Sequence, residues 1–167
     1  AESELRAALA INPRYSQAAD ALGQLQELSL GKFSDARISY KDAVKMDPNN
    51  ADAWLHLGLI NWQKFQESKT ARTELEKAAG METGKSVYRT ALATLLITEF
   101  KDYKEAEKLL TQSCQQNFAD SEAHYRLGML LIEKFGKRKA GEAELKIAYE
   151  QNPRDKDIKA AYERFVR

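Results

Sequence analysis

The residues that could do chemistry are few in this chain and widely spaced. The two histidines, His56 and His124, lie far apart, and Cys114 is the single cysteine. Their spacing matches no zinc-ligand pattern, and one thiol excludes an internal disulfide. Carboxylate pairs such as Glu105 and Glu107 fall between apolar helix positions, where a solvated face explains them. With no glycine-rich phosphate loop either, the sequence indicates no catalytic residue, no cofactor site and no metal site.

The elements that carry these residues follow a 35-residue period. Three positions of fixed size recur together in this period. A large apolar residue stands at Leu22, Leu57, Leu92 and Leu127, and a small one at Ala36, Ala71, Ala106 and Gly141. A second large residue follows four positions later, at Tyr40, Leu75, Leu110 and Leu145. Pro13, Pro48 and Pro153 lie on the same grid, with Thr83 and Phe118 at its two other positions. A small residue lets a neighbouring backbone approach, and a large one four positions later fills the gap on the same face. The period therefore predicts stacked copies of one two-helix unit.

Within one unit, apolar residues spaced three and four apart predict a first helix near 51–65 and a second near 68–79. The turn between them is marked in each unit by one large apolar residue and the residue after it, at Leu30-Gly31, Phe65-Gln66, Phe100-Lys101 and Phe135-Gly136. No alternation of period two is long enough to indicate strands. We therefore expect an all-α fold.

One segment carries the pattern of a known family. Trp54-Leu55-His56-Leu57-Gly58, followed by Ala71, Leu75 and Ala78 and preceded by Asp47-Pro48, resembles the tetratricopeptide repeat, with its W-x2-L-G, A-x3-F and P positions. The resemblance covers nearly the whole chain in four registers. It implies an all-α solenoid of helical hairpins wound as a right-handed superhelix.

Two departures from the family pattern carry structural expectations. The spacing is 35 instead of the usual 34, with the extra residue after the first glycine, so we expect a longer first helix or a modified turn. The usual aromatic residue three positions after the glycine is replaced, by Gln26, Asn61, Leu96 and Leu131. We therefore expect side-chain packing at this position to differ from the packing in the family.

The grid also divides the chain. We expect a single solenoid over 1–167, made of a half repeat 1–13, full repeats 14–48, 49–83, 84–118 and 119–153, and a capping helix 154–167. Glu163 stands where full repeats carry glycine or alanine, which suits a helix with no further partner. A chain that starts with half a repeat and no methionine is expected to be a piece of a longer one.

The composition sets the class of partner. Hydrophobic residues make up 43% and charged residues 31% of the chain, and the formal net charge is +1. This balance gives no global attraction to nucleic acid, and no apolar run is long enough for membrane insertion. The basic cluster Lys134, Lys137, Arg138 and Lys139 is interpreted as a solvated turn. We expect a soluble protein and slightly favour the cytoplasm, with the compartment left open.

The resemblance implies a non-enzymatic protein-protein interaction module. In the family, first helices line a concave groove that binds an extended or helical segment of a partner protein. Carried onto this chain, the groove-facing positions include Asp20, Leu55 and Thr90. The expected partner-binding residues are His56, Leu59, Trp62, Tyr125, Arg126 and Met129. Aromatic residues and arginine dominate interface energies. For Trp62, packing against a neighbouring first helix is the alternative.

Two other interpretations stay open. The chain could be a structural scaffold that self-associates through the solenoid ends or the convex face, or a recruiting segment of an enzyme whose catalytic domain lies outside these residues. Some family members instead clamp the C-terminal carboxylate of heat-shock chaperones. The corresponding positions here are Asp20, Gln24, His56, Leu59, Ala91 and Arg126. Only Arg126 suits a carboxylate, which argues against that activity.

Overall fold

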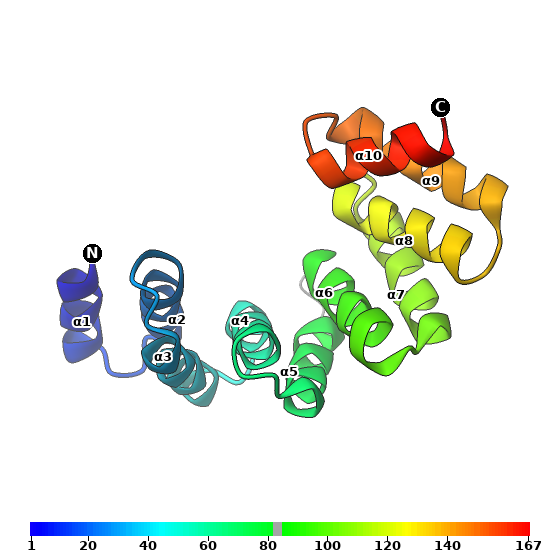
Figure 1. Cartoon of the computed structure of the whole chain (residues 1–167). Coiled ribbons are helices and arrows are strands. Elements are labelled where there is room, and N and C mark those ends of the chain that lie inside the picture. The colour runs from blue at the N-terminus through cyan, green and yellow to red at the C-terminus, as the bar shows by residue number, and fades with distance from the viewer. Residues whose placement is uncertain (82–84) are drawn as a thin grey trace. The chain divides into compact units, whose positions relative to one another are not determined.

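The computed structural model describes residues 1–81 and 85–167, which form helices joined by short turns (Figure 1). The chain divides into two compact units, Ala1–Thr83 and Gly84–Arg167, and each is described by itself. Thr83, one of the two grid positions without proline, lies outside the described residues, as does Gly84.

Over residues 1–81, the first unit contains five α-helices and one π-helical segment. They are α1 (Glu2–Ile11), α2 (Ser16–Gln24) with η1 (Leu25–Ser29), α3 (Phe33–Met46), α4 (Ala51–Gln63) and α5 (Ser68–Gly80). α2 with η1 packs against α3, and α4 packs against α5, so each pair forms a helical hairpin. The predicted helices near 51–65 and 68–79 are confirmed to within about two residues.

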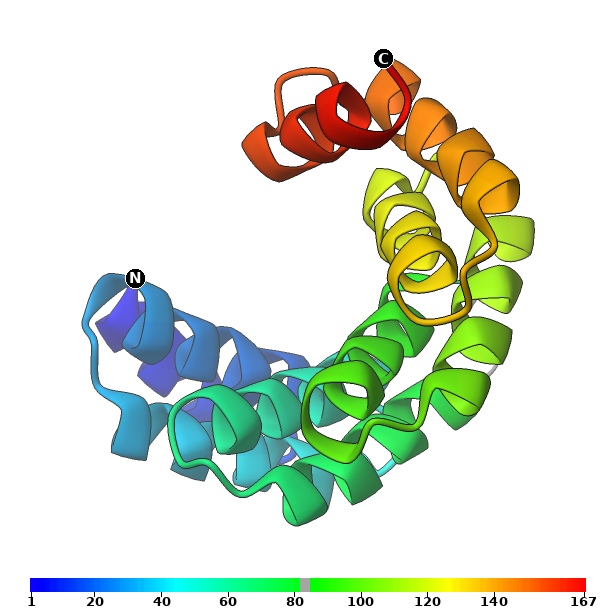
Figure 2. The ribbon, with the colours of Figure 1, turned by 45° about the vertical axis from the view of Figure 1, so that its right-hand side comes forward.

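The second unit repeats this order. It contains α6 (Val87–Leu95) with η2 (Leu96–Phe100), α7 (Tyr103–Gln116), α8 (Ser121–Glu133), α9 (Arg138–Gln151) and α10 (Lys156–Phe165). In both ribbon views α8 and α9 lie side by side (Figures 1 and 2). Among the described residues there is no strand, which confirms the all-α class. The division into a half repeat, four repeats and a cap within one solenoid stays a prediction.

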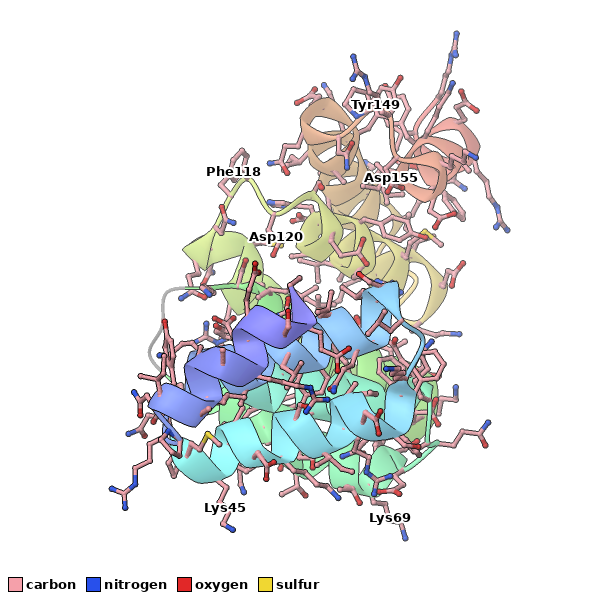
Figure 3. The ribbon with its side chains drawn as sticks, turned by 90° about the vertical axis from the view of Figure 1, so that its left-hand side faces the viewer. Lys45, Lys69, Phe118, Asp120, Tyr149 and Asp155 are labelled. Atoms are coloured by element: carbon pink, nitrogen blue, oxygen red, sulfur yellow. The ribbon has the colours of Figure 1, made fainter. Side chains whose placement is uncertain are left out.

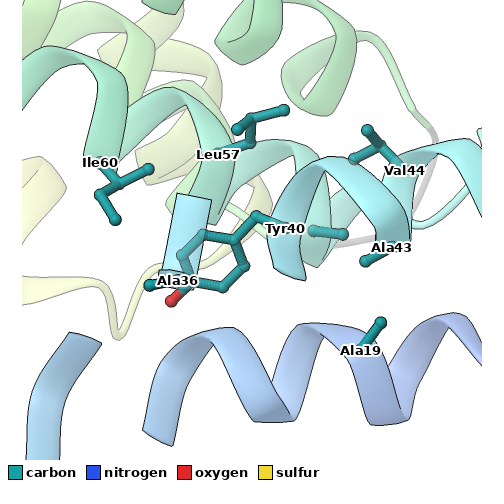
Figure 4. Packing of buried hydrophobic residues seen from close by; sticks show 8 residues of the cluster. Ala19, Ala36, Tyr40, Ala43, Val44, Leu57 and Ile60 are labelled. Atoms are coloured by element: carbon teal, nitrogen blue, oxygen red, sulfur yellow. The ribbon is translucent and has the colours of Figure 1, made fainter. Parts of the chain in front are cut away.

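Small residues let the helices of each hairpin approach closely. An ideal Cβ built on Gly58 would lie 2.8 Å from Cγ of Leu75, and one on Gly128 would lie 2.8 Å from Cγ of Leu145. In the first unit the aromatic ring of Tyr40 occupies the equivalent space beside Gly23, inside a buried cluster that Figure 4 shows. In these three hairpins, a small residue on the first helix therefore faces a large one on the second.

The turn inside each hairpin accounts for the 35-residue spacing. Its αL residue is Gly31, Gln66, Lys101 or Gly136, with φ of 64°, 57°, 56° and 64° respectively. The N–H of the next residue donates to the carbonyl six residues earlier, from Lys32 to Gln26, Glu67 to Asn61, Asp102 to Leu96 and Lys137 to Leu131. The Schellman closure of an α-helix spans five residues. One additional residue is thus enclosed in every turn, which confirms the predicted modification.

A polar contact joins successive hairpins in both units. Ser16 Oγ donates to the carbonyl of Ala43 and accepts from Asn50 Nδ2 at 2.8 Å, and Asn50 also caps α4. In the second unit Ser86 Oγ donates to Asp120 Oδ2 at 2.6 Å, and Asp120 caps α8 (Figure 3). These serines, 70 residues apart, tie the start of one first helix to the cap of the next.

Candidate partner-binding face

The six residues predicted to bind a partner lie on two first helices. His56, Leu59 and Trp62 belong to α4, and Tyr125, Arg126 and Met129 belong to α8; all six side chains are partly exposed. Spacing of three or four residues places members of each group on one side of their helix. The two groups belong to different units, so each is considered alone.

The α8 group lines two adjoining hollows. The first has a volume of about 180 Å³ and is lined by Ile97, Tyr125, Arg126, Met129, Leu130, Glu133 and Lys134. The second, of about 190 Å³, is lined by Tyr125, Met129, Asp157, Ala160, Ala161, Arg164 and Phe165. Tyr125 and Met129 contribute to both and therefore separate them. The structure thus brings all three predicted α8 residues together.

Charges of both signs surround these hollows. Arg126 Nε donates to Glu122 Oε1 at 2.6 Å, and its guanidinium carbon lies 5.7 Å from the ring centre of Tyr125. Burial raises the pKa of the Tyr125 phenol, although Arg126 acts in the opposite direction. The phenol therefore stays neutral at physiological pH and keeps a hydroxyl that can donate to a ligand.

On α4, His56 is held in a fixed orientation. Its Nδ1 lies 2.8 Å from Asp20 Oδ1, and its ring stacks on Tyr40 with centres 5.4 Å apart. Asp20 also accepts from Gln24 Nε2 at 2.9 Å. Because an ionised carboxylate only accepts hydrogen bonds, Nδ1 carries a proton. The second ring nitrogen, Nε2, is the atom that remains to contact a partner.

Other first-helix residues are placed differently from the prediction. Asp20, Leu55 and Thr90, which the family pattern assigns to the groove surface, are buried. Asp20 instead accepts the hydrogen bond from His56 Nδ1. Leu59 and Trp62 are half-buried on α4. The basic turn residues Lys137 and Arg138 bond Glu107 and Glu142, both at 2.7 Å, in exposed ion pairs.

Sequence reasoning missed one cluster altogether. Cys114 is buried, as predicted, and burial raises the pKa of its thiol to about 12. Ligand atoms of Cys114, His124 and Glu144 all lie within 4.8 Å of one another. The three residues come from α7, α8 and α9, so no local spacing pattern could have grouped them.

Comparison with known proteins shows which fold this chain shares. The TPR repeat family matches residues 25–64. The solved structure of YrrB, described as a TPR protein with an unusual peptide-binding site, is 24% identical and matches 99% of this chain and 87% of that chain, with a TM-score of 0.75. TTC0263, a thermophilic TPR protein of Thermus thermophilus, is 19% identical over 99% of this chain and 88% of that chain, with a TM-score of 0.76. The chain therefore has the fold of tetratricopeptide-repeat proteins, and residues 25–64 match one such repeat.

One curated relative is much longer than this chain. Protein O-mannosyl-transferase TMTC3 of Homo sapiens is 25% identical over 147 residues, which cover 87% of this chain and 16% of TMTC3. The chain thus spans about one sixth of that relative's length. Within residues 1–81 and 85–167, no helix combines the length and apolar character that a membrane span needs.

Proposed function

We propose that this chain is a non-enzymatic module that binds a short peptide or helix of a partner protein on its first-helix surface. The observation that carries the proposal is the pair of hollows on either side of Tyr125 and Met129. Their lining residues come from η2, α8 and α10 and from Lys134, which directly follows α8. These elements belong to the first helices of successive repeats, the surface that the family uses for partners.

The size of the hollows favours a peptide. Small-molecule sites have volumes of roughly 300–1,000 Å³. Each hollow here is smaller, with about 180 Å³ in one and 190 Å³ in the other. Such spaces suit single side chains. Two side chains of one peptide, on either side of Tyr125 and Met129, would fill them.

The polar residues at the hollows set the orientation of such a peptide. Arg126 and Lys134 stand at one hollow, and Asp157 and Arg164 at the other. A guanidinium offers paired donors to a carboxylate or to backbone carbonyls, so Arg126 would hold an acidic side chain or a main-chain turn. In the first unit, His56 Nε2 would contact a second peptide segment.

The TMTC3 match favours a second candidate function. A repeat region related to part of a transferase would recruit substrates or assembly partners to a catalytic domain elsewhere in a longer chain. This use still requires a peptide-binding surface. It differs from the first proposal in the identity of the partner and in the presence of a catalytic domain, both of which the full-length sequence would reveal.

A selection experiment tests the proposal. Peptides from a random display library, each about 12 residues long, are selected on the wild-type protein. They are then titrated against Tyr125→Ala and against Phe33→Ala, an exposed aromatic variant on the second helix α3. We expect Tyr125→Ala to lose affinity and Phe33→Ala to keep it. Equal affinity of the selected peptides for both variants would contradict binding on the first-helix surface.

A further inference from the structure

Three consecutive helices of the second unit bring a thiol, an imidazole and a carboxylate together. Cys114 lies near the end of α7, His124 in the first turn of α8 and Glu144 in the middle of α9. Their ligand atoms lie within 4.8 Å of one another. Cys114 and His124 are buried, and the Glu144 side chain is 25% exposed.

The hydrogen bonds of His124 fix its tautomer. Its Nε2 lies 3.1 Å from the carbonyl oxygen of Phe118, in the turn between α7 and α8 (Figure 3). A carbonyl can only accept, so Nε2 carries a proton. Histidine ligands of metals hold their second nitrogen in this way, by donating to a carbonyl or carboxylate. The remaining nitrogen, Nδ1, faces the other two groups.

Nδ1 and Glu144 share a proton in this arrangement. The distance from Nδ1 to Glu144 Oε2 is 2.6 Å, which is a short hydrogen bond. A divalent ion that replaced this proton and the Cys114 proton would bond to Nδ1, Oε2 and Sγ, with the release of two protons. For metal bonds of about 2.1 Å at tetrahedral angles, Nδ1 and Oε2 would separate to about 3.4 Å.

The ligand set selects the class of metal. A thiolate and an imidazole favour zinc over magnesium or calcium, which prefer oxygen ligands alone. Three protein ligands leave one tetrahedral position for water. The partly exposed Glu144 side chain gives that position its access to solvent.

Other repeats lack this combination. The positions equivalent to Cys114 hold Val44, Ala79 and Tyr149. In the second repeat the equivalent of Glu144 is Glu74, whose oxygens both accept from Asn61. The residue in the position of Asn61 is here Leu131, which offers no donor. Glu144 therefore bonds His124 in its place.

We propose that Cys114, His124 and Glu144 form a binding site for one zinc-class divalent cation between α7, α8 and α9. The sequence predicts no metal site, because the ligands meet only through the packing of three helices. The site would join the two hairpins of the second unit with bonds stronger than the hydrogen bond that now links α8 to α9.

Cobalt(II) is the probe for the test, because its bonds to a thiolate give a charge-transfer band and four-coordinate cobalt absorbs strongly in the visible. The reduced protein is titrated with cobalt(II) chloride and then with zinc(II). We expect one equivalent of cobalt to produce both signals and zinc to remove them. Zinc should also raise the melting temperature of the protein.

Three variants assign the ligands. Cys114→Ala introduces the residue that the second repeat has at the equivalent position, Ala79. Its circular dichroism spectrum should show that the protein stays folded, and its cobalt complex should lack the charge-transfer band. Glu144→Gln should bind cobalt at least about tenfold more weakly. Glu142→Gln, on the same helix but paired with Arg138, is the matched control and should bind like wild type. Absence of the band in the wild-type protein, or wild-type affinity in Glu144→Gln, would overturn the site.

Discussion

Buried polar residues replace the family aromatic at one position of the first unit. Gln26 and Asn61 are 2% and 0% exposed, and each reaches across its hairpin. Gln26 accepts from Ser39 Oγ at 2.7 Å, and Asn61 Nδ2 donates to both oxygens of Glu74, at 3.0 and 2.7 Å. The expected difference in packing is therefore confirmed, as a pair of buried hydrogen-bonded contacts.

Glu74 makes stability depend on pH. Burial raises the pKa of its carboxyl above the usual value, and the Asn61 bond only partly opposes this. The protonated Glu74 carboxyl contributes to the free energy of unfolding. This contribution is fully present below the unfolded-state pKa near 4.5 and is lost as the pH rises through the folded-state pKa. We expect Glu74→Gln to be about 1 kcal/mol more stable than wild type at alkaline pH, because its amide carries no charge to desolvate.

Urea unfolding of Glu74→Gln at about pH 8 and about pH 4.5 checks this expectation. The advantage over wild type should shrink at the lower pH. Glu76→Gln on the exposed side of the same helix is the control and should change stability by less than about 0.5 kcal/mol. An advantage for Glu74→Gln that grew towards acidic pH would contradict the direction of the pKa shift.

Gly141 tests how closely α8 and α9 approach. A Cβ at this position would lie 2.6 Å from the carbonyl oxygen of Gly128 and 2.5 Å from Ile132 Cγ1. Alanine gains about 1 kcal/mol in helix propensity but costs about 1–3 kcal/mol in overpacking. We expect Gly141→Ala to melt at a lower temperature than wild type. Gly80→Ala, with open space around it, should melt at the same or a higher temperature.

Single residues were predicted unevenly from the sequence. The small-large core positions were right because each contact recurs in every repeat. Asp20 and Leu55 were wrongly placed on the groove surface, because a helical register gives the face of a residue but not the depth to which neighbouring helices cover it. The Cys114, His124 and Glu144 cluster depends on three helices at once, and no short sequence window contains it.

At the level of elements, the turn of each hairpin contains one residue in the αL conformation. Gln66 and Lys101 adopt φ of 57° and 56°, where a Cβ costs about 1–2 kcal/mol. Glycine fills the same place at Gly31 and Gly136. The 35-residue spacing predicted either a longer first helix or a modified turn, and the apolar residue marked where the turn lies. The choice between these two could not be predicted, because the six-residue closure is a backbone hydrogen bond that no side chain specifies.

Exchanging these turn residues should change stability in opposite directions. Gln66→Gly should stabilise by up to about 1 kcal/mol, since relief of αL strain exceeds the entropy that glycine adds to the unfolded chain. Gly136→Ala should destabilise by about 1 kcal/mol. Denaturant midpoints of the two variants check both signs. If both moved in the same direction, the turn conformation would not be the cause.

At the level of the whole molecule, the sequence predicted the all-α class and the TPR fold because the same residues recur at one spacing through most of the chain. It could not supply the shape of the proposed binding surface. The hollows beside Tyr125 and Met129 depend on where α10 and η2 place Phe165 and Ile97 relative to α8. These placements follow from packing between repeats, which the period alone leaves open.

Two arginines offer a matched comparison for the binding surface. Arg126 on α8 bonds Glu122 at 2.6 Å, and Arg138 on α9 bonds Glu142 at 2.7 Å, each across one helical turn. Loss of either side chain therefore breaks a similar exposed ion pair, worth less than about 1 kcal/mol. Arg126 lines a hollow on the first-helix surface. Arg138 instead belongs to the basic turn that a scaffold would use.

Calorimetric titration of one selected peptide into wild type, Arg126→Ala and Arg138→Ala tests the central claim most directly. Binding on the first-helix surface predicts that Arg126→Ala weakens affinity by at least about 1–2 kcal/mol, roughly 5- to 30-fold in Kd, with Arg138→Ala unchanged. Unchanged affinity in Arg126→Ala together with a loss in Arg138→Ala would contradict it and would favour the scaffold.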